Sequence, residues 1–222
     1  MTISIIYESP QLLAVNKPNG LPVERDPHGY SSVEAWAAGI WPFVGIVHRL
    51  DRPVSGVLLL ARKKSALKNL NRQFEARTVK KIYLAIVEKA SPLPEGMLEH
   101  WMVKDQKGKR ARIATAGAKG AYQCRLTYRL LQSLPDGRSL LEVRPQTGKF
   151  HQIRVQLSAM GCPIAGDEKY GSGTTYMPEG IALHAWQLKV ADPAEGQALE
   201  LKAPCPEHAL WREFDYLAPE KK

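Results

Sequence analysis

Residues 47–64 read VHRLDRPVSGVLLLARKK, and this stretch carries a turn directly into a strand. Asp51 lies between Arg49 and Arg52, before a Pro-Val-Ser-Gly break, and the apolar run 56–62 that follows has the length and composition of a buried strand. Residue types leave two interpretations of Asp51 open. It is either half of a loop ion pair, which would contribute roughly 0 to 1 kcal/mol, or a carboxylate held ionised and immobile where a substrate could meet it.

Strands and helices follow one another irregularly on both sides of this stretch. Apolar runs closed by turn residues predict further strands at 3–7, 12–17, 44–48, 80–88, 121–131, 139–145, 181–190 and 198–204. Helical spacing and capping residues predict helices at 31–39, 65–77, 149–161 and 208–214. This order predicts an α+β fold with a central mixed, mainly antiparallel sheet flanked by helices.

The chain shows no clear internal division. No linker of low hydrophobicity separates two halves, so residues 1–222 are predicted to form one domain. The polar segment 90–120 contains the basic cluster 107–112 and is the best candidate for a long mobile stretch. Within it, residues 98–103 have the composition of an edge strand.

The charge of the chain indicates a polyanionic partner. Lys and Arg outnumber Asp and Glu and give a net charge of +9. Between Arg62 and Lys81 eight basic residues accompany one acid, whereas a solvated helix normally mixes the signs to form i,i+4 pairs. Lys64, Lys68 and Arg72 form a basic stripe on the predicted helix. We therefore favour a nucleic acid over a membrane surface or mere solubility.

Motifs for other classes of protein are missing. No apolar run is long enough to span a membrane and the opening MTISIIYESPQ lacks a signal-peptide pattern, so we expect a cytoplasmic protein. Three widely spaced cysteines, Cys124, Cys162 and Cys205, indicate buried thiols. The sequence has no zinc spacing, no G-x-S-x-G and no glycine-rich phosphate loop, and we expect neither a metal nor a cofactor.

Three side chains are candidates for chemistry: Asp51, Tyr83 and Arg154. Each also has an ordinary interpretation, as a turn carboxylate, a core aromatic in the strand 80–88, and a solvated arginine on the helix 149–161. Residue types alone do not choose between these interpretations.

Several motifs occur in a fixed order along the chain. They are Asn16-Lys17-Pro18-Asn19-Gly20, His48-Arg49-Leu50-Asp51 with Ser55-Gly56, Lys81-Ile82-Tyr83, Thr147–Arg154, and Gly161–Asp167 with Tyr170-Gly171. Together these motifs resemble the RluA family of RNA pseudouridine synthases, from about residue 5 to residue 188. The chain departs from the family pattern at Val54, Lys149 and Gln156, where Thr, Arg and His are usual.

The resemblance implies a pseudouridine synthase fold with an active-site cleft, a single catalytic domain without a separate N-terminal RNA-binding domain, and no cofactor. By position, Asp51 matches the catalytic aspartate, Tyr83 the tyrosine beneath the target base, and Arg154 the arginine that pairs with the aspartate. We also predict substrate contacts from His48, Arg49, Arg52, Lys68, Arg72 and His151. The expected substrate is a stem-loop of tRNA or rRNA, and we expect a monomer.

The reaction that the resemblance implies needs geometry and charge alone. It moves the ribose bond of uracil from nitrogen 1 to carbon 5 with no net change in composition. An ionised Asp51 could attack the sugar or the ring, or remove a sugar proton, and the sequence leaves these routes open. A neighbouring arginine lowers an aspartate pKa by roughly 1 to 3 units. Tyr83 offers a stacking surface, and its phenol, with a pKa near about 10, is a weak base.

Two other functions fit the same sequence. One is a non-catalytic RNA-binding or RNA-chaperone protein of the same fold, which would not need the carboxylate of Asp51. The other is a metal-assisted nuclease that uses Asp51 and His48, which EDTA would silence.

Overall fold

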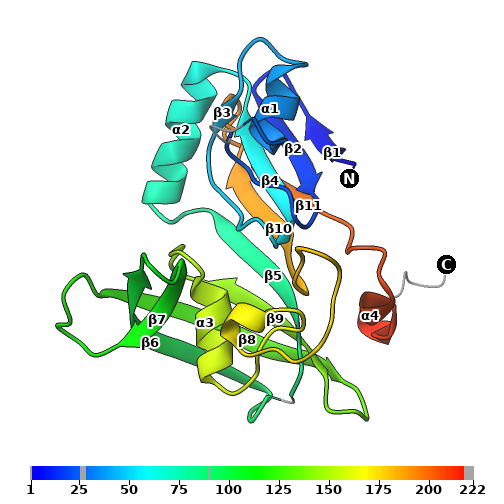
Figure 1. The fold of residues 1–222 in the computed structure, drawn as a ribbon. Coiled ribbons are helices and arrows are strands. Elements are labelled where there is room, and N and C mark those ends of the chain that lie inside the picture. The colour runs from blue at the N-terminus through cyan, green and yellow to red at the C-terminus, as the bar shows by residue number, and fades with distance from the viewer. Residues whose placement is uncertain (1, 26–28, 90, 218–222) are drawn as a thin grey trace. The chain divides into compact units, whose positions relative to one another are not determined.

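The computed structural model describes residues 2–25, 29–89 and 91–217, and the chain divides into two compact units. The first unit comprises Met1–Ile82, Pro178–Gly180 and His184–Cys205, and the second comprises Tyr83–Met177, Ile181–Leu183 and Pro206–Lys222. The α+β class and the mixed, mainly antiparallel strand pairing are confirmed within the units (Figure 1). The single catalytic domain over residues 1–222 stays a prediction.

The first unit is a sheet with two helices. Its elements are β1 (Ser4–Glu8), β2 (Leu12–Lys17), α1 (Val33–Ala38), β3 (Gly45–Ile46), β4 (Ser55–Ala61), α2 (Lys64–Glu75), β10 (Leu183–Ala191) and β11 (Ala198–Lys202). The strands run in the order β1-β2-β4-β10-β11. β3 pairs Leu60 and Ala61 of β4, the residues that pair β2 on the other side, so β3 lies on the β4 edge opposite β2. β10 pairs β4 in parallel, and the other pairs described in this unit are antiparallel.

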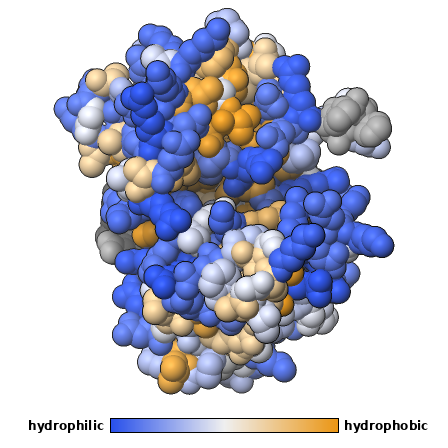
Figure 2. All heavy atoms as spheres, turned by 90° about the vertical axis from the view of Figure 1, so that its left-hand side faces the viewer, coloured by the Kyte–Doolittle hydropathy of each residue, from blue (hydrophilic) through white to orange (hydrophobic). Residues whose placement is uncertain are grey.

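Strand β4 lies at the centre of the first unit. All seven of its residues are buried, as expected for the apolar run GVLLLA with strands on both sides. Leu59 of β4 packs in one cluster with Leu70 of α2 and Leu188 of β10. The opposite side of α2 exposes Lys64, Lys68 and Arg72, and the face on which α2 lies is largely hydrophilic in Figure 2.

The second unit is an antiparallel sheet with one main helix. Its elements are β5 (Lys80–Val87) from Tyr83 onward, β6 (Glu95–Asp105), β7 (Arg110–Ala114), β8 (Tyr122–Ser133), β9 (Ser139–Pro145), α3 (Gln152–Ala159), the 3-10 turn η1 (Glu168–Tyr170), α4 (Ala209–Arg212) and the 3-10 turn η2 (Asp215–Leu217). The strand order is β5-β9-β8-β6-β7, with every pair antiparallel. Helix α3 packs on this sheet through Val155, beside Met102 and Cys124.

The prediction of a long mobile stretch at 90–120 is wrong over its described part, and residue 90 lies outside the described residues. Strand β6 runs for eleven residues and pairs with β8, while β7 pairs with β6. The basic cluster 107–112 falls in the tight turn and at the start of β7. The suggested strand 98–103 is confirmed as a strand but is too short, because pairing with β8 extends it to Glu95 and pairing with β7 extends it to Asp105. It is not an edge strand, since β6 lies between β8 and β7.

Helix α3 begins three residues later than predicted. His151 precedes it in a left-handed conformation, with φ of 54°. Phe150 is consequently outside the helix, where its ring stacks on the ring of His151 at 3.8 Å. Nε2 of His151 lies 3.0 Å from Nη1 of Arg154 in the first turn of the helix.

Candidate active site

Asp51 lies in the turn that connects β3 to β4 in the first unit, and it is half-buried. The N–H of Val54 donates to the carbonyl of Asp51 at 3.0 Å and closes the turn. Gly56 follows with φ of 114°, and a Cβ there would lie 2.3 Å from the carbonyl oxygen of Ala185 in β10. Only glycine permits this close approach, so the chain beyond Asp51 is fixed against a neighbouring strand.

A second loop, 17–21, holds the Asp51 turn. The Nζ of Lys17 donates to the carbonyls of Pro18, Leu21 and Arg52 at 2.9, 2.8 and 3.1 Å. The amide of Asn19 donates to the carbonyl of Pro53 at 2.6 Å. Because the ammonium donates to the residue directly after Asp51, the backbone that follows the carboxylate is tied down.

Lys17 is fully buried, and burial is the main reason why its pKa falls to about 7. The negative charge of Asp51 raises the pKa of Lys17 and the guanidinium of Arg52 lowers it, both to a smaller extent than burial. Lys17 stands in one of the motifs quoted above, but its contact with the Asp51 turn was not predicted. A lysine that ends an apolar strand directly before a Pro-Asn-Gly turn was the available signal.

The other predicted residues of this turn have identified partners in the first unit. Arg49 is exposed and pairs with Glu24 at 2.8 Å, and Arg52 donates from Nε to the carbonyl of Gly20 at 2.9 Å. His48 accepts from the N–H of Leu59 through Nε2 at 3.0 Å. Burial lowers the pKa of His48 to about 3. Their substrate contacts stay predictions.

Tyr83 lies in β5, half-buried, opposite Val143 of β9. Since side chains alternate between the faces of a sheet, Tyr83 shares the face of Val143 and of Tyr128, the partner of Val143 in β8. Cys124 of β8 is on this same face, where α3 packs. The predicted stacking tyrosine and the helix that carries Arg154 are therefore on one face of the second unit's sheet.

Arg154 of α3 is buried and pairs with Asp167 through two hydrogen bonds, Nε to Oδ2 at 2.7 Å and Nη2 to Oδ1 at 2.8 Å. Its Nη1 lies 3.0 Å from Nε2 of His151. The ordinary interpretation of Arg154 as a solvated arginine is wrong, because only 5% of the side chain is exposed. A bidentate pair fixes the plane of the guanidinium.

Gln156, one of the departures from the family pattern, also lies on α3 and is fully buried. Its amide nitrogen donates to the carbonyl of Leu98 at 3.1 Å and contacts Nδ1 of His100 at 3.1 Å. This position therefore joins the helix to β6.

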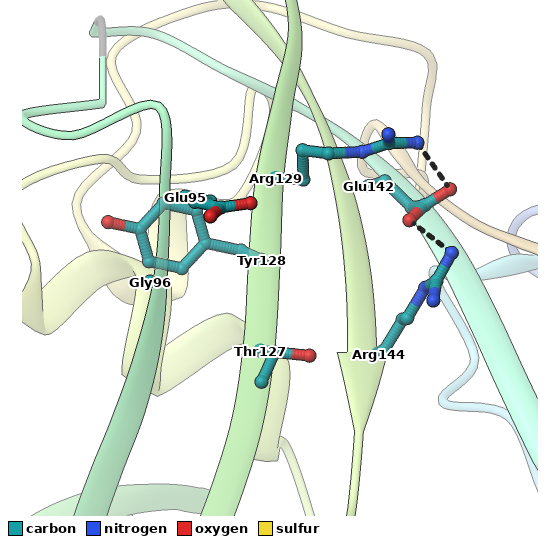
Figure 3. Close-up of a pocket in the computed structure, with 7 residues that line it drawn as sticks. All are labelled: Glu95, Gly96, Thr127, Tyr128, Arg129, Glu142 and Arg144. Atoms are coloured by element: carbon teal, nitrogen blue, oxygen red, sulfur yellow. Dashed lines mark ion pairs between the residues drawn. The ribbon is translucent and has the colours of Figure 1, made fainter.

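A shallow pocket opens on the second unit, and Figure 3 shows the residues that line it. Its charged centre is Glu142, which pairs with Arg144 at 2.8 Å and Arg129 at 3.6 Å. Glu142 neighbours Val143 in β9, so its side chain points to the sheet face opposite Tyr83. The ion pairs of this pocket therefore lie on the sheet face opposite Tyr83.

Within residues 2–25, 29–89 and 91–217, no group of three His, Cys, Asp or Glu side chains is placed to hold a metal ion. In the same ranges, no helix has the length and apolar character needed to cross a membrane. Cys124 and Cys162 are buried, as predicted, and Cys205 is half-buried.

The chain matches the family model for RNA pseudouridylate synthases over residues 11–159. It is 34% identical to ribosomal large subunit pseudouridine synthase C of Vibrio cholerae, over 92% of this chain and 66% of that protein. It is 34% identical to an uncharacterized RNA pseudouridine synthase of Zymomonas mobilis, over 91% of this chain and 93% of that protein. It is 32% identical to the dual-specificity RNA pseudouridine synthase RluA of Yersinia pestis, over 89% of this chain and 97% of that protein.

Solved structures agree with the sequence comparisons. The human RNA pseudouridylate synthase domain containing 4 superposes with a TM-score of 0.75 at 26% identity, covering 92% of this chain and 89% of that one. The chain belongs to the RluA family of RNA pseudouridine synthases, which are isomerases that modify RNA. It spans about two thirds of the length of the Vibrio cholerae relative.

Proposed function

We propose that this protein converts specific uridines of a tRNA or rRNA stem-loop to pseudouridine, with Asp51 as the catalytic carboxylate. The observation that carries the proposal is the family match over residues 11–159, which contains Asp51, Tyr83 and Arg154 at the positions of the family motifs. We further propose that it works as a monomer in the cytoplasm, where these RNAs are found.

The local structure around Asp51 supports a catalytic role for this carboxylate. Its backbone is held by the Val54 hydrogen bond, and the next residue accepts from Lys17. Preorganisation of this kind removes the entropic cost of orienting a reacting group. In the reaction the bond from ribose carbon 1 to nitrogen 1 breaks, the bond to carbon 5 forms, carbon 5 loses its proton and nitrogen 1 gains one. Asp51 acts as nucleophile or as base in the first of these steps.

Arg154 and Tyr83 complete the proposed site. We assign to Arg154 the pairing that keeps Asp51 ionised, since a guanidinium stays charged at every relevant pH. Tyr83 provides the ring on which the everted uracil stacks. A stacked uridine must leave its helix to reach such a ring, which costs a few kcal/mol. Arg49 is exposed beside Asp51 in the chain and would fill the space that the base vacates.

The test incubates the protein with transcribed tRNA and rRNA fragments and maps pseudouridine by carbodiimide-dependent stops of reverse transcription. We expect new stops with the unmodified protein and a loss of at least about 100-fold in rate with Asp51→Asn. Asp192→Asn is the matched control, because Asp192 is a turn carboxylate of the same unit that accepts from the N–H of Ala194.

Two outcomes would overturn the proposal. RNA binding without any pseudouridine, unchanged by Asp51→Asn, would indicate a non-catalytic RNA-binding or chaperone protein. Cleaved RNA that disappears on adding EDTA would indicate a metal-assisted nuclease.

A further inference from the structure

His151 has both ring nitrogens engaged in a buried network of the second unit. Its Nδ1 lies 2.8 Å from the hydroxyl of Tyr170, and its Nε2 lies 3.0 Å from Nη1 of Arg154. His151 is 9% exposed, and the ring of Phe150 stacks on its ring. His151 therefore contacts the guanidinium that the proposed function assigns to catalysis.

The positions of the protons follow from the chemistry of the partners. A guanidinium only donates hydrogen bonds, so Nε2 of His151 must accept and carries no proton. A neutral imidazole then has its proton on Nδ1, which donates to the hydroxyl oxygen of Tyr170. That oxygen also accepts from the N–H of Ala111 at 2.8 Å, and the hydroxyl donates to the Ala111 carbonyl at 3.4 Å.

A second proton on His151 would conflict with this network. Nε2–H would point at an N–H of Arg154, and two donors would face each other. Burial first, and then the charges of Arg154, Lys169 and Lys104, lower the pKa of His151 to about 3. The carboxylate of Asp167 is already engaged by Arg154 through both oxygens. His151 is consequently neutral over the whole physiological range of pH.

We infer that His151 is a positioning residue, a neutral imidazole protonated on Nδ1 that fixes the guanidinium of Arg154 from the side opposite Asp167. This inference rests on the proposed function and replaces a direct contact between His151 and RNA. Asp167 holds Nε and Nη2, and His151 holds Nη1. Tyr170 anchors the imidazole to the backbone of β7. With two partners on different edges, the guanidinium cannot rotate in its own plane.

The direct test determines the tautomer of His151 by NMR. In the 15N-labelled protein, long-range 1H–15N spectra of the six histidine rings show which ring nitrogen carries the proton. We expect a protonated Nδ1, an unprotonated Nε2 and no titration between pH 8 and 5. His208 is an internal contrast, because its Nδ1 accepts from the N–H of Leu210 at 3.2 Å and its proton must be on Nε2. A protonated Nε2 on His151, or titration in that range, overturns the inference.

Two variants complete the test. His151→Asn assigns the signals by their loss, and asparagine tolerates the left-handed backbone at this position. We expect it to lower kcat by about 10- to 100-fold with little change in KM, since a misplaced catalytic group affects the chemical step. Tyr170→Phe removes the partner of Nδ1, and should shift the Nδ1 resonance more than the Nε2 resonance.

An unchanged kcat in folded His151→Asn overturns the positioning role. A protein that makes no pseudouridine at all overturns the proposed function, and in that case the spectrum alone decides the tautomer. The two failures are thus distinguishable.

Discussion

Arg154 and Asp167 form a bidentate ion pair in which both side chains are almost inaccessible, with exposed fractions of 5% and 1%. Two parallel hydrogen bonds of 2.7 and 2.8 Å set the plane of the guanidinium in α3. A buried charge that loses its partner is costly, because the remaining ion has neither water nor a counterion.

Asp167→Asn should therefore destabilise the protein by about 3 to 5 kcal/mol, measured as the free energy of unfolding in urea. Glu99→Gln is the control, since it breaks the exposed pair between Glu99 and Arg125 in the same unit. We expect a clearly smaller loss for the control. Equal losses for both substitutions would show that burial does not set the strength of the Asp167 contact.

Gly56→Ala tests the close approach of the Asp51 turn to β10. The added methyl would lie 2.3 Å from the carbonyl oxygen and 2.6 Å from the nitrogen of Ala185, both backbone atoms. Gly137→Ala is a matched control with φ of 90° and open space around the Cβ position. Both suffer left-handed strain, but only Gly56→Ala adds an overpacking cost of about 1 to 3 kcal/mol. Similar midpoints of thermal unfolding for the two variants would contradict the described contact.

Lys17→Met tests the buried ammonium that donates to the carbonyl of Arg52, next to Asp51. The unfolded chain keeps the Lys17 proton up to a pH near the ordinary value of 10.5, whereas the folded protein releases it at about 7. Between these values the unfolded state binds more protons, so Lys17 makes stability rise with pH, by up to about 1.4 kcal/mol per unit. The measurement is the free energy of unfolding from pH 7 to 9.5. If the free energy of unfolding changed with pH in the same way for Lys17→Met and for the unmodified protein, a lowered pKa of Lys17 would be excluded.

The basic stripe on α2 is predicted to contact the phosphates of RNA. Replacing Lys68 and Arg72 by glutamate should make binding less dependent on salt. The plot of the logarithm of the binding constant against the logarithm of the salt concentration should become shallower by about 1 to 2 units of slope. Lys189 and Lys202 already pair with Glu200, so reversing both is a control with the same change in net charge. The predicted interface is refuted by an unchanged slope in the α2 variant.

Arg49→Ala should slow the modification of a stem-loop by about tenfold or more, and should spare a short unpaired RNA that needs no base eversion. Glu24→Gln is the control, because it releases Arg49 from its 2.8 Å pair and keeps the arginine. The measurement is the single-turnover rate of each variant on the stem-loop and on the short unpaired RNA. Equal losses on the two RNAs would assign Arg49 to general binding.

Local signals were sufficient for much of the fold. The predicted bounds 12–17 and 139–145 match β2 and β9, and Ser32 caps α1 by accepting from the N–H of Ala35. Apolar runs between turn residues determine such elements without reference to the rest of the chain. The hairpin of β6 and β7 was missed because only one residue of each strand is buried, so its sequence stays polar, and β6 is held in the sheet by pairing with β8.

In the candidate site, too, some residues could be predicted from the sequence and others could not. The family motifs gave the positions of Asp51, Tyr83 and Arg154 directly. Lys17 and Asp167 stand in the quoted motifs, but their partners could not be predicted, since Lys17 donates to the distant backbone carbonyl of Arg52 and Asp167 pairs with the side chain of Arg154. Three-dimensional information is needed for such buried polar partners.

The parallel pairing of β4 with β10 has a consequence for biosynthesis. Ser55 and His184, which face each other across this pair with a 2.8 Å contact, are 129 residues apart in the chain. At about 5 to 20 residues per second, a ribosome takes roughly 6 to 26 seconds to travel between them. During that interval this edge of β4 lacks its partner strand, and its apolar residues are available to nascent-chain chaperones.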